Sequence, residues 1–561
     1  MNNQHSEKRQ IIKLFTIGAV LGTVIFIMIF GTHVLDPTYD DWILADQDDL
    51  TQHYFGWKFL RESSWHFPLG LIDRFDSSGG ISCIFFDCVP LFAVFFKLFS
   101  PVLPETFQYI GIWELFCFAM TGGSSAVLLH RFSRNDFFCL CGSIVFIISP
   151  TILQRVLHHE ALSAQWIIVL AIILWVYQEQ ERENKAVPVI LWCILGIITV
   201  TVHLYFIPMI YLIMLGYMMT DILRTKKAGH SVLCFVSTTM CVLLTMFSFG
   251  VFYGKGDMQA TGLGKYSSNY NALINPMGYS KFLKPLKYFK GQRSGLGYIG
   301  LGMITAVIIS LIIVIYLIVR YMRSHNDFGK VAGEKAKIII PVLIVLAIAM
   351  FIAASPKGTL NRHVIYEIKY PEKIENILKI FRASGRFIWV DIYIIYTIIF
   401  ALLSKVRIKS INILLVIVCT VVQFLDLSDF ILSKHETYME DIRYKNDISA
   451  ESFEEATENA DRIVCMPITK NYLNYKKLYF SLGEYVCDRD IKMNVFYTAR
   501  QDYKVLKQSA DEEYQNLING YGDINTLYVF LNNKYIPEES EDFRFYKFGK
   551  YTAVRVNQEN S

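Results

Sequence analysis

The chain lacks the cysteine spacings that are typical of metal-binding and redox proteins. Its eleven cysteines include no CxxC pair, and no Cys or His cluster has the spacing of a metal site. Cys465 and Cys487 lie in a polar tail, where export would permit a disulfide between them. Most of the others are expected to pack as small hydrophobic side chains within apolar runs: Cys117, Cys139, Cys141, Cys193, Cys234, Cys241 and Cys419.

Charge is also scarce, because only 19% of the 561 residues are charged and 53% are hydrophobic. Apolar runs long enough to cross a hydrocarbon core of about 30 Å recur over the first three quarters of the chain. The first run, from Leu14 to Phe30, follows the basic stretch "EKRQIIK" and has no small-residue cleavage site, which indicates a retained span. The sequence therefore predicts a polytopic α-helical membrane protein.

Lysine and arginine gather in short connections between the apolar runs, and this bias predicts which connections are cytoplasmic. The basic connections are 130–136, 180–185, 223–227, 320–337 and 404–410. Placing them in the cytoplasm with the N-terminus gives eleven membrane crossings and an outer tail. The expected spans are 14–33, 108–129, 137–152, 164–178, 187–202, 204–220, 231–253, 298–319, 338–354, 387–403 and 411–427.

Residues 84–99, "IFFDCVPLFAVFFKLF", are apolar but have no crossing to make in this topology. The run is interrupted by Pro90 and carries Asp87 and Lys97, so we expect an interfacial or re-entrant helix within the first outer loop, 34–107.

The tail has a different composition, which divides the chain into a membrane domain, 1–429, and a soluble domain, 430–561. Residues 447–460 predict an acidic helix capped by Ser449 or Ser452, and residues 499–520 predict a helix closed by Gly520. Short strands are expected at 462–468, 492–498 and 526–532, followed by a hairpin over 543–556 that turns at "GK". This alternation predicts a small extracytoplasmic α/β domain, without a nucleotide-binding loop, that scaffolds or recruits.

The first outer loop is unusually acidic, with six carboxylates among aromatic residues in "DPTYDDWILADQDDLTQHYFGW" (36–57). If 48–60 is helical, Asp49, Gln52, His53 and Gly56 share one face. A carboxylate, an amide and an imidazole on one face are typical of a site that binds a sugar hydroxyl and removes its proton. The structural alternative is that the acids complement the helix dipole and Asp48 is an N-cap.

A second polar connection on the same predicted side is "LQRVLHHEALSAQW". Binding or satisfied structural contacts near the membrane surface would both account for such side chains. Its candidate residues are Arg155, His158, His159, Glu160 and Gln165. Neighbouring predicted spans hold His203 and Glu114, and helix pairing is the favoured interpretation for Glu114.

Two long outer loops, 254–297 and 355–386, are rich in lysine and arginine, against the usual charge bias. They are interpreted either as solvated surface or as an anion site. In "FRASGRFIW", Arg382 and Arg386 are four residues apart, so on a helix they could grip one phosphate group. Tyr266 and Asn269 belong to "GLGKYSSNYNALINP", whose composition is typical of a polar binding loop.

The order of these features resembles the GT-C superfamily of membrane glycosyltransferases, which use polyprenyl-phosphate sugars as donors. The resemblance is carried by "DLTQHYFGWKFLRESSWHFPLG", "DCVPLFAVFFKLFSPVLPETFQYIGIW", "HEALSAQW" and "FRASGRFIW", which together span most of the membrane region and are similar to a bacterial branch of that superfamily. It implies a GT-C-like fold with juxtamembrane helices in the first outer loop.

The resemblance also implies an inverting glycosyl transfer. Asp49 stands where the family's catalytic base is expected, with Asp48 or Asp41 as alternatives. Arg382 and Arg386 fit the binding of the lipid phosphate, and His159 matches a family histidine, whereas Gln165 stands where a histidine is expected. These residues identify no particular cofactor, and a divalent cation is compatible with them.

The expected location is a bacterial plasma membrane, with a lipid-linked sugar donor, a glycan or cell-wall polymer as acceptor, and no nucleic acid. The alternatives are a lipid-linked glycan transporter or flippase, and a non-catalytic membrane scaffold. A transporter would place paired charges near the bilayer midplane and show broken helices or repeats, whereas the polar residues here gather at the predicted outer ends of the spans and no clear repeat is visible.

Overall fold

The computed structural model describes residues 2–75, 79–178, 185–253, 262–324, 328–499 and 502–557. The chain folds into two compact units, each assembled from three segments. The first comprises Met1–Asp36, Ile110–Leu243 and Ala260–Glu440, and the second comprises Pro37–Tyr109, Leu244–Gln259 and Asp441–Ser561. Most of the first outer loop therefore belongs to the same unit as the tail. The predicted basic connection 180–185 lies almost wholly outside the described residues, as do parts of 254–297 and 320–337.

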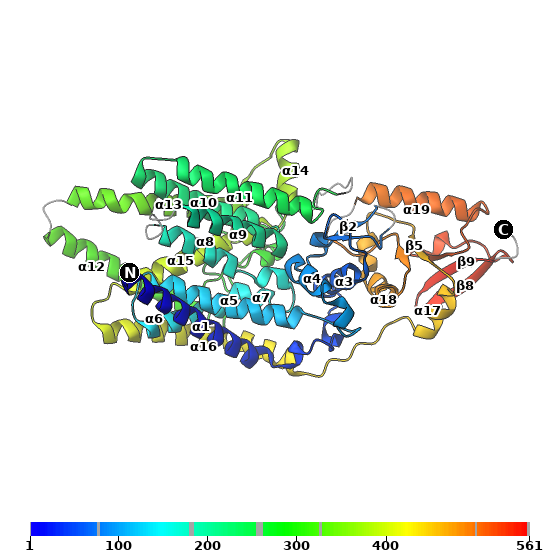
Figure 1. Ribbon diagram of the computed structural model, residues 1–561, viewed down its shortest axis with the longest axis horizontal. Coiled ribbons are helices and arrows are strands. Elements are labelled where there is room, and N and C mark those ends of the chain that lie inside the picture. The colour runs from blue at the N-terminus through cyan, green and yellow to red at the C-terminus, as the bar shows by residue number, and fades with distance from the viewer. Residues whose placement is uncertain are drawn as a thin grey trace. The chain divides into compact units, whose positions relative to one another are not determined.

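The first unit is helical (Figure 1). Its helices are α1 (Asn2–Phe30), α5 (Ile110–His130), α6 (Asp136–Ile147), α7 (Pro150–Arg155), α8 (Trp166–Tyr177), α9 (Ala186–Val202), α10 (Phe206–Thr225), α11 (Gly229–Ser248, whose last turn belongs to the second unit), α12 (Leu301–Ser324), α13 (Phe328–Ala354), α14 (Glu372–Ile380), α15 (Ile388–Leu403) and α16 (Lys409–Met439). A short hairpin of β3 (Lys357–Leu360) and β4 (His363–Glu367) follows α13.

Ten helical segments of the described chain are long and apolar enough to span a membrane. The sequence predicts eleven, and the difference is α9, an apolar helix of 17 residues that is just shorter than the other spans. The predicted span at 137–152 is broken before Pro150, which opens α7 as the first residue of a new helical segment. A polytopic membrane protein is thus confirmed.

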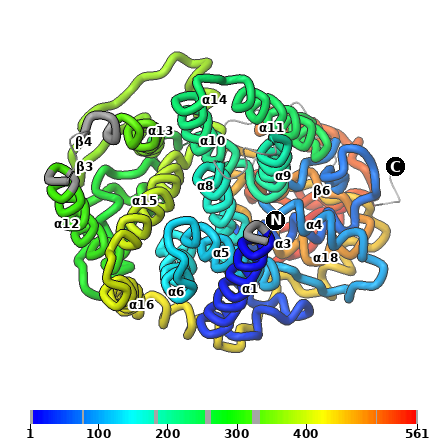
Figure 2. Tube along the Cα trace, turned by 60° about the vertical axis from the view of Figure 1, so that its left-hand side comes forward, coloured from blue at the N-terminus to red at the C-terminus, as the bar shows by residue number. Residues whose placement is uncertain are grey.

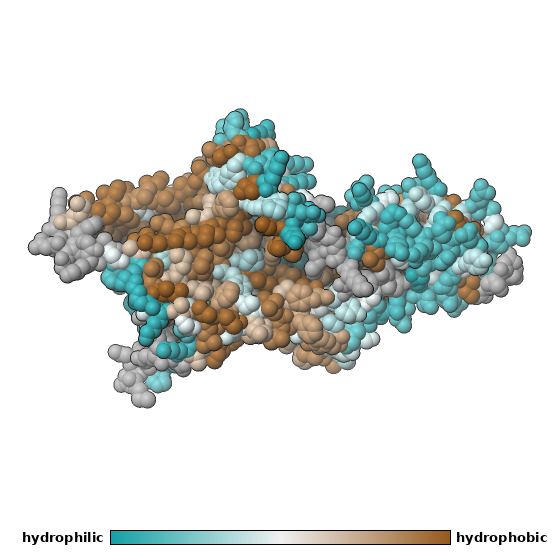
Figure 3. Space-filling model, turned by 90° about the horizontal axis from the view of Figure 1, so that it is seen from above, coloured by the Kyte–Doolittle hydropathy of each residue, from teal (hydrophilic) through white to brown (hydrophobic). Residues whose placement is uncertain are grey.

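Close helix contacts in the first unit depend on glycine. Gly18 and Gly22 of α1 lie against α5, where an added Cβ would come within 2.5 Å of the Gly122 oxygen and 2.1 Å of the Phe118 oxygen, respectively. Small residues four apart are a recurrent means of bringing membrane helices together. In Figure 2, α1 and α5 lie side by side. On the side seen in Figure 3, much of the surface over these helices is brown, that is, apolar.

The second unit begins with two short helices, α2 (Asp41–Leu44) and α3 (Asp49–Glu62), and a two-stranded ladder of β1 (Leu71–Ile72) and β2 (Ile81–Ser82). The apolar segment 84–99 forms a 3₁₀ turn and then α4 (Pro90–Lys97). At about 1.5 Å per residue, the 8 residues of α4 are far too few to cross a bilayer.

The tail forms a five-stranded sheet in the order β6-β5-β7-β9-β8. Its strands are β5 (Arg462–Met466), β6 (Lys492–Met493), β7 (Thr526–Phe530), β8 (Phe543–Phe548) and β9 (Tyr551–Val556). The helices are α17 (Ala450–Thr457), α18 (Lys476–Val486) and α19 (Tyr503–Ile518). The predicted Ser449 cap and the hairpin over 543–556 are confirmed, but the strand expected at 492–498 pairs over only two residues. Cys465 and Cys487 are buried as free thiols, so the disulfide that export would permit between them is not formed.

Candidate functional site

The acidic face of α3 forms much as the sequence predicts. The helix begins at Asp49 and buries Gln52 and His53, whereas Asp49 itself is half-exposed. Asp48 occupies the N-cap position, but its side chain makes no capping hydrogen bond and instead pairs with Lys476 at 2.5 Å. The Asp48 side chain therefore forms an ion pair within the second unit and does not cap the helix.

The three candidate bases have different partners. Asp49 Oδ1 accepts a hydrogen bond from the Tyr497 hydroxyl at 3.5 Å. Asp41 lies 3.7 Å from Arg443 and accepts the backbone N–H of Tyr444. Asp41 and Asp48 are thus each engaged by a cation, whereas the partner of the Asp49 carboxylate is a neutral hydroxyl. This comparison favours Asp49.

The close approach of α3 to the turn after β2 places His53 beside Asp87. Gly56 makes the approach feasible, since a Cβ there would lie 2.4 Å from the Phe86 Cβ. Asp87 has a left-handed backbone (φ +55°), which aspartate tolerates better than most residues, and this turns the chain sharply after the 3₁₀ turn. An imidazole nitrogen of His53 and a carboxylate oxygen of Asp87 lie within 4.8 Å of each other. Gln52 donates a long, 3.5 Å hydrogen bond to the Phe85 carbonyl.

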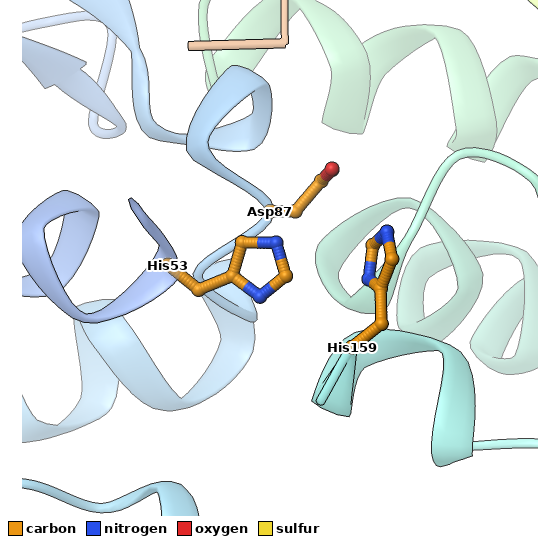
Figure 4. A group of neighbouring side chains, drawn as sticks. All are labelled: His53, Asp87 and His159. Atoms are coloured by element: carbon orange, nitrogen blue, oxygen red, sulfur yellow. The ribbon is translucent and has the colours of Figure 1, made fainter. Parts of the chain in front are cut away.

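Figure 4 shows His53 and Asp87 pointing toward the same space. Nitrogen and carboxylate ligands of this kind suit a hydrogen bond to a hydroxyl or the coordination of a divalent cation. The figure also labels His159, a residue of the first unit. From the sequence, Asp87 is assigned only to an apolar segment. The hydrophobic periodicity of α3 and of this segment does not reveal that the two pack together.

In the first unit, three connections between helices meet around Tyr205. The His159 ring lies 5.8 Å from the His203 ring, which lies 5.4 Å from the Tyr205 ring. The Arg386 guanidinium lies over the Tyr205 ring at 4.7 Å, and the Tyr205 hydroxyl accepts the backbone N–H of Ala383. Residues far apart in the sequence are thus fixed in one cluster of two imidazoles and a guanidinium.

The polar connection after α7 is built into the first unit by hydrogen bonds. Arg155 donates to the Ser294 carbonyl at 2.7 Å and lies over the Trp389 ring. Glu160 is buried, whereas His158 is exposed. Glu114 accepts hydrogen bonds from the Leu157 N–H and the Ser163 hydroxyl, which orders this connection against α5 and agrees with the structural interpretation of Glu114.

Two of the predicted polar residues are engaged inside the protein. Gln165 accepts hydrogen bonds from the Thr151 and Tyr393 hydroxyls, both at 2.8 Å. Asn269 is fully buried, and its amide nitrogen donates to the Asn361 carbonyl and to the side chains of Gln292 and Thr359. Arg382 lies over the half-exposed ring of Tyr266 at 5.7 Å. Arg382 and Arg386 precede α15, in a segment that includes a 3₁₀ turn (Ser384–Phe387), so the α-helix on which the two arginines would share a face is not formed there.

The sequence analysis missed Asp391, which is almost fully buried in α15. Neither of its carboxylate oxygens has a hydrogen-bond partner in the described part of the chain. The available signal was a single acid in the apolar run "IWVDIYI". An ionisable residue inside a membrane span is costly and commonly functional.

Comparison with known families gives two adjoining matches. Residues 452–556 match the C-terminal domain of a family described as DUF6311, and residues 19–428 match the principal domain of that family, a domain of unknown function. A search of curated proteins finds no match. Since the principal match covers well over half of the sequence, the chain belongs to the DUF6311 family.

Proposed function

We propose that this protein is an inverting glycosyltransferase that moves a sugar from a polyprenyl-phosphate donor to an extracytoplasmic glycan at a bacterial plasma membrane. The observation that carries the proposal is the cluster of His159, His203 and Arg386 around Tyr205 in the first unit. Departure of a lipid phosphate from a sugar develops negative charge, and pre-positioned guanidinium and imidazole groups stabilise such charge. Arg382 and Arg155 lie in connections of the same unit and would add to the positive potential.

The backbone fixes how His203 can act. The Tyr205 N–H donates a hydrogen bond to His203 Nδ1 at 3.1 Å, so the neutral ring carries its proton on Nε2. That tautomer presents an N–H donor, which suits a phosphate oxygen. Arg386 remains charged at any physiological pH and is the stronger partner for a phosphate.

The proposed base is Asp49 in the second unit. It would accept the proton of the acceptor hydroxyl as that oxygen attacks the anomeric carbon, while the bond from the sugar to the lipid phosphate breaks. Asp49 is half-exposed and, among the residues that the structure describes, its carboxylate accepts one long hydrogen bond, from Tyr497, whereas Asp41 and Asp48 pair with cations. A positioned base of this kind contributes about 10²- to 10⁴-fold to the rate.

Asp391 favours a second candidate function, transport of a lipid-linked glycan. A buried carboxylate without a partner in the described chain is typical of proton and ion pathways in transporters. In that case Asp391→Asn would abolish function, whereas Asp49→Asn would leave it intact.

The proposal is tested by the lipid intermediate that the enzyme would consume. Cells that lack the protein should accumulate a polyprenyl-phosphate sugar, measured by mass spectrometry of lipid extracts. The wild-type chain should remove this lipid, and Asp49→Asn and Arg386→Gln should not. Glu62→Gln, at the far end of α3, is the matched control and should behave as wild type. Consumption of the lipid by Asp49→Asn at the wild-type rate would contradict the assignment of the base.

A further inference from the structure

A cationic cavity lies in the two basic loops of the first unit and shares no lining residue with the cluster around Tyr205. It has a volume of about 360 Å³ and is lined by Pro285, Leu286, Lys287, Tyr288, Lys290 and Arg362. Three of these six residues are cations, and no acidic residue lines the cavity. Its size falls at the lower end of the range of small-ligand sites.

In the described part of the chain, no acidic side chain pairs with any of the three cations. Other lysines of these loops form ion pairs, such as Lys281 with Asp429 at 2.8 Å and Lys379 with Glu375 at 2.9 Å. Among the residues that the structure describes, no ion pair involves Lys287, Lys290 or Arg362. The cavity therefore concentrates positive charge, which favours an anionic ligand.

The loops that carry these cations are held in place by buried amides. Asn271 donates to the Lys287 carbonyl at 3.0 Å and to the Asn361 side chain at 2.9 Å. Asn275 both donates to the Leu286 carbonyl and accepts the Leu286 N–H. These hydrogen bonds order the backbone that presents the cations. Less conformational entropy is therefore lost when a ligand binds.

A second pair of buried amides joins the two loops. Asn269 donates to the Asn361 carbonyl and accepts the Asn361 N–H, directly before Arg362. Gln292 accepts the Phe289 N–H, beside Lys290, and donates to Thr359 at 2.7 Å. Asn269 and Gln292 are themselves joined by a 3.0 Å hydrogen bond. The positions of Lys290 and Arg362 are therefore coupled through the interior, as in a built site and unlike a chance gathering of surface lysines.

The two loops that carry the cations also expose large apolar side chains. Leu286 lines the cavity, and Phe282, Phe289, Val364 and Ile365 of the same two loops are each more than one third exposed. These loops adjoin the ends of α12 and α13, two candidate spans. Exposed apolar groups among cations, next to the end of a membrane span, are typical of contact with the membrane interface.

We infer that Lys287, Lys290 and Arg362 bind the phosphate of a membrane lipid headgroup, with the acyl chains or polyprenyl chain against the exposed apolar side chains. Arginine binds phosphate in a fork and lysine as a point charge, so the three together suit a phosphate monoester or diester. A soluble phosphate compound has the same anionic group but would leave the apolar contacts unused. The site is independent of the proposed transfer reaction, since it is defined by binding alone.

The test uses the purified full-length protein and three probes. Dioctanoyl phosphatidic acid carries both the phosphate and the chains, glycerol 3-phosphate carries only the phosphate, and dioctanoylglycerol carries only the chains. Binding is measured by native mass spectrometry or by microscale thermophoresis. We expect phosphatidic acid to bind at least tenfold more tightly than either of the other probes.

The variant Lys287→Gln/Lys290→Gln/Arg362→Gln should weaken binding of phosphatidic acid by about 100-fold, at about fivefold for each cation near a membrane surface. The matched control Lys284→Gln/Lys369→Gln/Lys373→Gln removes the same charge from exposed positions of the same loops and should change binding less than threefold. The inference would be overturned if glycerol 3-phosphate bound as tightly as phosphatidic acid. It would also be overturned if both triple variants lost the same affinity for phosphatidic acid, or if the first variant bound it as tightly as the wild type. All six side chains are exposed, and unchanged elution on size exclusion verifies folding.

Discussion

The helices of the first unit and the sheet domain of the second expose opposite kinds of side chain. In α12, Ile312 and Ile315 are 64% and 62% exposed, while polar residues such as Ser125 and Gln165 are buried elsewhere in the same unit. In the second unit all five residues of β7 are buried, and the exposed residues of α19 are mostly charged or amide-bearing. The difference shows which solvent each unit meets: lipid around the first, water around the sheet domain.

The two units also differ in what holds them together. Glycines let α1 and α5 approach in the first unit, where lipid removes the hydrophobic drive between helices and close packing takes its place. In the second unit an aromatic cluster links α3 to the sheet domain, with the Phe496 ring 4.9 Å from Phe59 and 5.5 Å from Phe55. Burial of large rings away from water is the main source of stability there.

The largest expected effect on stability is in the aromatic cluster. Phe496→Ala should cost about 3–5 kcal/mol, because Phe496 is fully buried and contacts rings from α3, the turn after β2 and α18. Hydrogen exchange of the β5 amides, which lie in the same unit, should accelerate by two or more orders of magnitude. Tyr521→Ala, at an exposed position of the same unit, is the control and should leave exchange unchanged. Equal exchange in Phe496→Ala and wild type would contradict the assigned role of the cluster.

A smaller loss is expected from crowding the helix contact in the first unit. Gly22→Leu should cost about 1–3 kcal/mol, because the side chain would meet the α5 backbone at Phe118. The thermal unfolding midpoint in detergent should fall for Gly22→Leu, and it should fall by a smaller amount for Gly22→Ala. Val24→Leu, on the exposed face of α1, should not move it. A midpoint for Gly22→Leu equal to that of Val24→Leu would show that the contact is not tight.

A third expected effect on stability depends on pH. Burial of Lys97 in α4 lowers its pKa to about 8, while its ammonium donates to the Ser63 carbonyl. The unfolded chain, with an ordinary lysine pKa of about 10.4, binds more protons between these values, so stability rises with pH across that window by at most about 1.4 kcal/mol per pH unit.

Lys97→Met removes this titration, so its denaturation midpoint relative to wild type should fall steadily from pH 8 to pH 10. The measurement is a urea or guanidinium titration at each pH. Lys284→Met, at an exposed site, should track the wild-type protein throughout. A constant difference between Lys97→Met and wild type would mean that Lys97 titrates normally.

Local features were predicted well from the sequence. The apolar runs became helices, α3 began within one residue of its predicted start, and the hairpin turned at Gly549 as expected. Each of these depends on hydrophobic periodicity or on turn chemistry within a few residues. The α9 helix shows the limit. An apolar helix of 17 residues has the same local sequence pattern whether or not it crosses the membrane.

Features formed by distant residues could not be predicted. The hydrogen bond from Tyr497 to Asp49 joins positions 448 apart, and the amide pair of Asn269 and Asn361 joins positions 92 apart. The composition of the loop around Asn269 suggested a flexible binding segment, whereas its amides are buried within the protein. A single sequence records which residues are polar but not which polar groups are paired across the fold.

The most direct test of the proposed function is the cell-envelope glycan profile of cells that carry the protein, lack it, or carry Asp49→Asn. Glycosyl transfer predicts that one sugar is missing from an otherwise complete polymer, both without the protein and with Asp49→Asn expressed at the wild-type level. A complete glycan in cells carrying Asp49→Asn, or loss of the entire polymer instead of one residue, would contradict the account.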